Sequence, residues 1–304
     1  DKSSMAKTLN SMAILNWKTR EKDEALKNWL QALSIVEELE DKPKISKYLN
    51  NIGIWYRDDS DYSKSVEYYQ KSLTIKEDLG DVRNIGKTLN NIGNVYFMMG
   101  DYENSVEHYG RSVEIKEKLQ DNKGLASTMN NIGETYFYQA NYDDALLSFR
   151  QSSSYGKDDD NIFDNERYIG MSHYYLGNYD SCKIYLKRAD EYFSSSQVKR
   201  LAILPYLIVS HKKTGDAKRS DEILQKFKEI AQENDAEKKD FIIANWASYE
   251  ALDFIGQSEE AREFLENAYF EIKSRSRDIK NKSDRNKYLA ANLHDKITKA
   301  WNSK

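Results

Sequence analysis

Apolar positions along the chain recur with the spacing of amphipathic helices, and one order of residues returns about every 40 positions. The run Asn50-Asn51-Ile52-Gly53 reappears at residues 90–93 and again at residues 130–133. A weaker copy stands at residues 10–13. A constant spacing of this kind is typical of a repeated structural unit. The pattern therefore predicts a stack of similar helical units.

A second pattern runs through all seven predicted copies, with a small residue first, a bulky one four positions later and another small one seven positions later. The first small residues are Ala25, Ser65, Ser105, Ala145, Cys182, Ser220 and Ala261. The bulky residues are Trp29, Tyr69, Tyr109, Phe149, Leu186, Leu224 and Leu265, and only Phe227 breaks the third position.

Offsets of four and seven place these three residues on one helical face. The small residues allow a neighbouring helix to approach closely, so we expect the first ones, apart from Ser220, to be buried. Each unit is predicted to be two antiparallel helices, A and then B, joined by a short turn such as residues 99–102. A single pair cannot bury both faces, so the units must stack.

One unit carries the order Leu89-x-x-Ile92-Gly93-x-x-Tyr96, followed by Ser105, Tyr109 and Ser112. This order resembles the tetratricopeptide repeat, although the units have about 40 residues rather than the usual 34. The long form is similar to the repeats of kinesin light chain, of the Leu-Gly-Asn-repeat scaffold and of bacterial signalling proteins. The resemblance implies an all-α fold: an α-solenoid of about seven helix pairs in a right-handed superhelix, with a C-terminal capping helix.

The regularity of the copies divides this one continuous solenoid into three stretches. Residues 1–153 hold the regular copies 1–4, residues 154–272 the degenerate copies 5–7, and residues 273–304 a basic linker and the capping helix. Pro205 falls inside helix A of copy 6, so that helix is expected to start late or to kink. Residues 282–301 are expected to form one amphipathic helix with Leu289, Leu293, Ile297 and Trp301 on its apolar face.

Charge is distributed unevenly, although the formal total is only −4. Residues 273–304 hold ten Lys/Arg and three Asp/Glu, a net +7, and the remaining residues carry a net −11. Neither a nucleic acid nor a membrane is an expected partner, because the basic stretch is short and no apolar run approaches the roughly 18 residues of a span.

A single cysteine, Cys182, fits a reducing compartment and hence a cytoplasmic location. The chain starts at Asp1 rather than Met, so we expect a processed product or an excised fragment.

Catalytic motifs are missing from the sequence. Gly80 and Gly86-Lys87-Thr88 imitate a phosphate-binding loop, but five residues separate the glycines where the motif has four. The four histidines share no metal-ligand spacing. His173 and His211 take a tyrosine position of the other copies, so they are expected to be packed rings. We predict no enzyme, no cofactor and no metal site.

The family resemblance also implies which side chains line a concave peptide groove. With Gly93 counted as position 8, positions 2, 5, 6, 9, 12 and 13 face that groove. The predicted peptide-binding residues are Asn50, Asn51, Asn90, Asn91, Asn94, Asn130, Asn131, Lys87, Phe97, Phe137 and Tyr138. An asparagine amide both donates and accepts, as a peptide backbone does, and aromatic rings can take apolar anchors. In the alternative interpretation the amides only bridge neighbouring helices and the rings belong to the core.

Chaperone-tail-binding members of the family hold a C-terminal carboxylate with a five-residue clamp. Over copies 1–3 only Asn51 and Lys87 agree with that clamp, because most of its cationic donors are replaced. A chaperone C-terminus is therefore rejected as the ligand.

Two functions remain open. The first is a non-enzymatic protein–protein interaction scaffold that binds an extended peptide or partner segment in the groove. The alternative is a regulatory or sensor array of a larger signalling protein, such as a kinase, cyclase, protease or transcription regulator.

The basic C-terminal end has its own alternatives. It is either a solvated face or a surface that docks an acidic neighbour, for which weak self-association is the predicted form. Its basic residues are Arg275, Arg277, Lys280, Lys282, Arg285 and Lys287.

Overall fold

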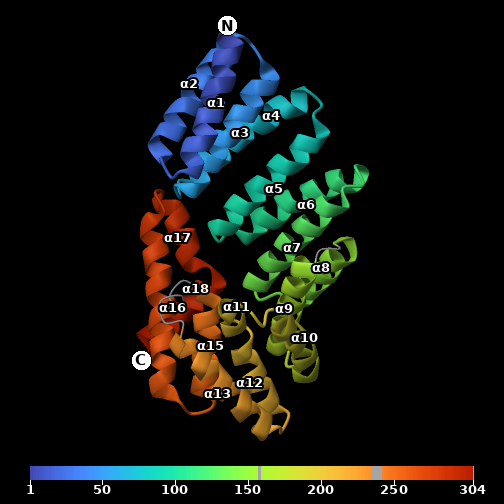
Figure 1. Ribbon diagram of the computed structural model, residues 1–304, viewed down its shortest axis with the longest axis vertical. Coiled ribbons are helices and arrows are strands. Elements are labelled where there is room, and N and C mark those ends of the chain that lie inside the picture. Colours follow the sequence, from blue (N-terminus) through green and yellow to red (C-terminus); the bar gives the residue numbers. More distant parts are fainter. Residues whose placement is uncertain (157–158, 234–241, 304) are drawn as a thin grey trace. The chain divides into compact units, whose positions relative to one another are not determined.

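The computed structural model describes residues 1–156, 159–233 and 242–303, and within these ranges the regular structure is helical, without a strand. Consecutive helices pack as antiparallel pairs (Figure 1). The first four pairs are α1 (Lys2–Lys18) with α2 (Lys22–Glu38), α3 (Lys42–Asp58) with α4 (Tyr62–Asp78), α5 (Val82–Met98) with α6 (Tyr102–Lys118), and α7 (Asn122–Tyr138) with α8 (Tyr142–Tyr155).

The later helices are less regular in length. They are α9 (Asp159–Tyr175), α10 (Tyr179–Tyr192), α11 (Gln197–Leu201), α12 (Leu204–Lys213), α13 (Ala217–Glu233), α15 (Ile242–Phe254), α16 (Ser258–Asp278), α17 (Lys282–Ala290) and α18 (Asn292–Asn302). The predicted all-α class is confirmed.

Small residues hold each pair together, as their spacing predicted. Ala25, Ser65, Ser105, Ala145, Cys182 and Ala261 are all fully buried. The serines also act as hydrogen-bond donors, because the Oγ atoms of Ser65 and Ser105 donate to the carbonyl oxygens of Gly53 and Gly93, at 2.8 and 3.0 Å. A hydroxyl in this position donates its hydrogen bond to a backbone carbonyl of helix A and occupies no more room than a methyl group.

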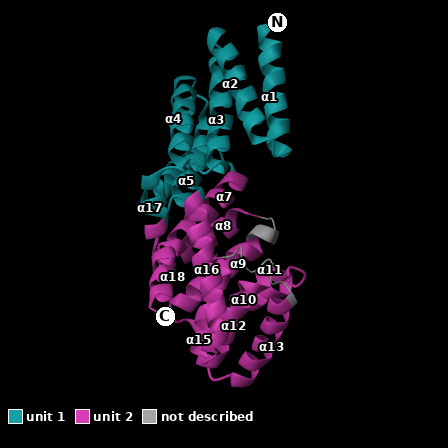
Figure 2. Ribbon diagram, turned by 90° about the vertical axis from the view of Figure 1, so that its left-hand side faces the viewer, with its two compact units in different colours: residues 1–121, 278–288 teal, residues 122–277, 289–304 magenta. Residues whose placement is uncertain are grey.

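Contacts divide the chain into two compact units (Figure 2). Unit 1 comprises residues 1–121 and 278–288, and unit 2 comprises residues 122–277 and 289–304. The C-terminal segment therefore contributes first to unit 1 and then to unit 2. The predicted division at residues 153 and 272 follows regularity of sequence rather than contacts, and it stays a prediction.

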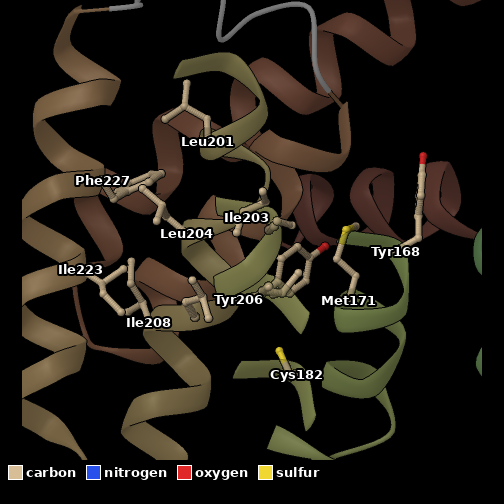
Figure 3. Packing of buried hydrophobic residues seen from close by; sticks show 14 of the residues in the cluster. Tyr168, Met171, Cys182, Leu201, Ile203, Leu204, Tyr206, Ile208, Ile223 and Phe227 are labelled. Carbon is tan, nitrogen blue, oxygen red and sulfur yellow. The ribbon is translucent and has the colours of Figure 1, made fainter. Parts of the chain in front are cut away.

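Unit 2 has a continuous apolar core built from α7 to α16. Figure 3 shows Cys182 of α10 and Tyr206 of α12 within it. Pro205 interrupts helix A of this copy as expected: α11 ends at Leu201, and α12 starts at Leu204 with the proline in its first turn. A proline has no N–H to lose at that position, so the chain restarts its helix there.

The C-terminal end differs from the prediction of one helix over residues 282–301. The backbone is extended at Ala291, with φ −56° and ψ 139°, and it separates α17 from α18. Residues up to Tyr288 belong to unit 1 and residues from Leu289 belong to unit 2, so most of α17 packs in unit 1 and α18 packs in unit 2. Ile297 is fully buried, as its apolar spacing predicted.

Candidate functional site

A cleft of about 610 Å³ opens in unit 1 between α3, α4, α5 and α6. We call it the lysine–asparagine cleft after its lining residues, which are Pro43, Ser46, Lys47, Asn50, Lys76, Asp81, Asn84, Lys87, Asn90, Asn91 and Lys116. Four of these, Asn50, Lys87, Asn90 and Asn91, belong to the predicted peptide-binding set. Four lysines against one aspartate make the lining cationic.

Two of the lysines, Lys76 and Lys116, come from the B helices and are nearly buried. The ammonium group of Lys76 donates to Thr88 Oγ1 at 2.6 Å. Burial lowers the pKa of each lysine to about 8, and the positive charge of Lys87 lowers it further, against the opposing pull of Asp81 on Lys76 and of Asp121 on Lys116. A partly desolvated ammonium group is a strong donor for an anionic ligand, since little water must be removed from it on binding.

Sequence reasoning missed these two lysines because it looked for groove residues only on the A helices. A signal was nevertheless present. Lys76 and Lys116 stand eleven positions after the small residues Ser65 and Ser105, in line with the offsets of four and seven that mark the buried face. Val36 holds the same place in the first copy and is fully buried. A lysine on an otherwise apolar stripe indicates a charge held inside the structure.

The predicted asparagines behave differently from one copy to the next. Asn51 Nδ2 donates to Asn10 Oδ1 at 3.0 Å, and the indole N–H of Trp29 donates to the same oxygen at 3.1 Å. These amides bridge helices, as the alternative interpretation expected. Asn50 and Asn91 are the equivalent pair one copy later. Neither side chain has a recorded hydrogen bond among the described residues, and both line the cleft.

The other predicted residues lie outside the cleft. In unit 1, Asn94 Oδ1 accepts from the Tyr109 hydroxyl at 2.5 Å, and the Phe97 ring lies 5.8 Å from that of Tyr102. In unit 2, Asn130 Nδ2 donates to Asn165 Oδ1 at 2.8 Å. Asn131, Phe137 and Tyr138 also belong to unit 2. The eleven predicted residues are thus shared between two units rather than gathered in one place.

Comparison with known families agrees with the repeat geometry. The tetratricopeptide repeat model matches residues 4–78 and 84–158, which cover the first four helix pairs. The chain belongs to the tetratricopeptide repeat family. No curated protein sequence matches it.

Solved structures with the same fold extend the likeness to most of this tetratricopeptide repeat protein. The apo form of RapI is 15% identical, covers 90% of this chain and 98% of its own, and has a TM-score of 0.71. The quorum sensor NprR from B. thuringiensis is 16% identical, with coverages of 88% and 76% and a TM-score of 0.64. A STAND protein with a tetratricopeptide repeat sensor from Pyrococcus horikoshii is 17% identical, with coverages of 87% and 39% and a TM-score of 0.69.

The basic C-terminal end of the repeat array docks on its own chain. Lys287 pairs with Asp101 at 2.6 Å and Lys280 with Asp59 at 3.7 Å. Both acceptors lie at the turns between A and B helices. These ion pairs lie within unit 1, and docking of the basic end on a second copy or an adjoining domain stays a prediction.

Of the side chains that the sequence assigned to packing, His173 and Cys182 are packed, whereas His211 is only partly buried and its Nδ1 atom lies 3.1 Å from Asp216 Oδ2. The His173 ring stacks on Tyr185 with centroids 5.6 Å apart. Cys182 is buried and accepts a hydrogen bond from Ser210 at 3.2 Å, and burial raises the pKa of its thiol to about 12. Such a thiol is a poor nucleophile.

In residues 1–156, 159–233 and 242–303, no group of three or more His, Cys, Asp or Glu side chains is placed to hold a metal ion. Nor does any helix there combine the length and apolar character needed to cross a membrane.

Proposed function

We propose that this tetratricopeptide repeat protein is a non-enzymatic, cytoplasmic interaction scaffold whose lysine–asparagine cleft binds an extended, acidic peptide segment. One observation carries the proposal: four lysines line the same cleft as Asn50 and Asn91. No side-chain hydrogen bond of these two asparagines is recorded among the described residues. The amides can pair with a peptide backbone, while the ammonium groups take its carboxylates. The site therefore favours an anionic partner over a neutral one.

The cleft has a size that suits a peptide segment rather than a whole protein surface. Its volume of about 610 Å³ lies within the 300–1,000 Å³ that is usual for ligand pockets. Its four lysines come from four helices, α3 to α6, so a bound carboxylate can be approached from more than one side. The buried pair Lys76 and Lys116 supplies donors that are already held in place, which lowers the entropic cost of binding.

The test uses fluorescein-labelled decapeptides with Glu at alternate positions, compared with the same sequences carrying Gln or Lys. Fluorescence anisotropy should show binding of the Glu peptides only. Lys87→Gln should weaken it about tenfold or more, since a hydrogen bond to a charged group contributes about 1.5–3 kcal/mol. Lys118→Gln is the matched control, because Lys118 is exposed and lies outside the cleft. Equal binding of Gln and Glu peptides, or equal loss in both variants, would refute the proposal.

A second candidate function is a regulatory or sensor array within a larger signalling protein. The likeness to a quorum sensor and to the sensor of a STAND protein favours it. In this case the acidic peptide is the signal rather than a structural partner. The reading frame around this chain tests the idea, since an adjoining effector domain would support it and flanking stop codons would contradict it.

A further inference from the structure

A second cavity lies in unit 2, among α7, α8, α9, α12, α15 and α18. We call it the aromatic cavity, because five of its lining residues are Phe137, Tyr142, Tyr175, Tyr206 and Trp246. Its volume is about 40 Å³, room for about three water molecules at 10–15 Å³ each. A cavity of that size admits the end of a side chain or a very small molecule.

One carboxylate, that of Glu250 on α15, stands among these rings. Its Oε2 atom accepts a hydrogen bond from the Tyr175 hydroxyl at 3.2 Å, and that hydroxyl lies 3.3 Å from the hydroxyl of Tyr206. Within the described residues no hydrogen bond is recorded to the other oxygen, Oε1. A carboxylate surrounded by aromatic rings, with one oxygen left open, can accept a hydrogen bond from a cationic ligand.

The rings that surround Glu250 are held in fixed orientations. Tyr142 and Tyr175 stack with centroids 4.8 Å apart, and Tyr206 meets Tyr175 edge-on at 5.9 Å. Trp246, whose exposed fraction is 9%, lies on the same wall. Aromatic faces attract cations through their quadrupole, most strongly at tryptophan.

Helix α18 supplies the last wall through Asn292, Leu293 and Lys296. Asn292 Nδ2 donates to the carbonyl oxygen of Gln139 at 3.2 Å, which fixes the start of the helix beside the cavity. Lys296 brings a positive charge to the lining but forms no recorded ion pair with Glu250 within the described residues. The Lys296 side chain is exposed and leaves the cavity open, but its positive charge repels a cation that binds there.

We propose that the aromatic cavity binds a small ammonium group, carried either by a free alkylamine or by a lysine side chain of a partner. Glu250 neutralises the charge and the rings surround its methyl or methylene groups. This site is independent of the lysine–asparagine cleft, which selects the opposite charge.

Protonation of Glu250 should control the binding. Burial raises the pKa of Glu250 to about 7, while its hydrogen bond from Tyr175 and the charge of Lys296 lower it. The other titratable groups that interact with it are the hydroxyls of Tyr142, Tyr174 and Tyr206. Glu250 is ionised above its pKa, so amine affinity should rise as the pH increases from 6 to 8.

The experiment follows the indole N–H signal of Trp246 in ¹⁵N-tryptophan-labelled protein, assigned with Trp246→Phe. Methylamine and trimethylamine should shift that signal at pH 8, whereas the uncharged tert-butanol should not. A comparison of acetyl-lysine-amide with acetyl-norleucine-amide, which lacks the ammonium group, shows whether the cavity accepts a lysine side chain as well as a free amine. Glu250→Gln should weaken amine binding at least tenfold, and Glu259→Gln, on an exposed residue of α16, should leave it unchanged.

Lys296→Ala gives a test in the opposite direction, because removal of its charge should strengthen amine binding several-fold at low salt. This variant and the pH series keep the proposal testable even if Glu250→Gln fails to fold. An equal response to tert-butanol and to the amines would overturn the proposal, and so would the absence of any shift. Acidic peptides play no part in the assay, so failure of the cleft proposal does not affect the outcome.

Discussion

Copies 2 to 4 each have a glycine that lies against the side chain sixteen positions later. A Cβ atom placed on Gly93 would stand 2.6 Å from the Tyr109 ring, and one on Gly133 would stand 2.7 Å from Phe149. The contact explains why the repeated Asn-Asn-Ile-Gly motif ends in glycine: the ring of helix B packs directly on the backbone of helix A. At the residue scale, this close approach and the two buried lysines give the sharpest tests.

Gly93→Ala should destabilise the protein, because the aromatic ring of Tyr109 is fully buried and has little room to move. We expect a loss of about 1–3 kcal/mol, the usual cost of overpacking. Gly110→Ala is the matched control, since nothing lies within 4 Å of the added methyl group in α6. It should stabilise by about 0.5–1 kcal/mol, the helix preference of alanine over glycine. Urea unfolding measures the change in the free energy of unfolding of each variant. Equal midpoints for the two variants would contradict the close contact between Gly93 and Tyr109.

Lys76 and Lys116 should make peptide binding depend on pH. Their pKa values of about 8 lie below the usual 10.5, so both lose charge as the pH rises through 8. Affinity for the Glu peptide should fall about tenfold or more between pH 7 and 9.5, the loss of one charged hydrogen bond. The same titration should make the protein more stable as the pH rises from about 8 to 10.5, because only the unfolded chain then holds these protons.

A double variant, Lys76→Met with Lys116→Met, provides the control for that pH dependence. It should bind the peptide weakly at pH 7, and its remaining affinity should change little up to pH 9.5. A wild-type profile that stays flat across this interval would remove both lysines from the binding site.

Helix ends set the length of the repeat at the scale of the element. In unit 1 most helices end with a residue at positive φ, and the residue after it, usually an aspartate, caps the next helix. After α5, the Gly100 N–H donates to Phe97 O and the Asp101 N–H to Tyr96 O. The Asp101 carboxylate then accepts from Asn104 N at 3.4 Å. This three-residue connection terminates one helix and starts the next, and with helices of 17 residues it explains the repeat of 20 residues within each 40.

Among the described residues, the positive-φ positions that are not glycine are Arg20, Glu40, Ser60 and Gln120 in unit 1 and Ala140 in unit 2. Glu40→Gly should therefore stabilise the protein. An L-residue in the left-handed region costs about 1–2 kcal/mol, and the extra conformational entropy that glycine loses on folding offsets only part of the relief from that strain. We expect a gain of about 0.5–1 kcal/mol. Gln31→Gly, at an exposed mid-helix position of α2, should lose about as much. Thermal unfolding distinguishes the two, and a destabilised Glu40→Gly would contradict the helix-end geometry.

The whole molecule is divided by contacts into two units, and the C-terminal segment contributes to each. On unit 1 the anchor is Asp284, whose exposed fraction is 3%. Its Oδ2 atom accepts from Ser63 N at 3.1 Å and from Ser63 Oγ at 2.7 Å. These donors lie in the first turn of α4, where a negative charge also interacts favourably with the helix dipole.

Asp284→Ala should free residues 278–288 from unit 1 and leave the first turn of α4 less protected. The expected loss of stability is about 1–3 kcal/mol, the cost of leaving buried donors unsatisfied. Hydrogen exchange should quicken at Ser63 and in α17. Asp295→Ala, which removes only an exposed pair with Lys299, is the control and should change exchange at neither place. Unchanged exchange in Asp284→Ala would show that the segment is held by other contacts.

The sequence by itself determined the helical pairs, the buried small residues and the family. These features depend on spacing along a single helix, and the period of 3.6 residues converts such spacing directly into a buried face. Ser105 and Ala145 are buried for that local reason. The sequence also indicated the late start of α12, because the effect of Pro205 on a helix is local.

Only the tertiary structure decided what the polar positions do. Asn51 and Asn91 hold the same place in successive copies, yet the first bridges to Asn10 and the second lines a cleft. The difference depends on the neighbours that stacking brings together. Likewise the aromatic cavity combines Glu250 with rings from helices more than a hundred residues apart, and Ala291 breaks a helix so that α18 can complete the cavity wall. Such arrangements depend on the energies of contacts between residues far apart in the sequence, and the spacing of residues within one helix does not reveal those contacts.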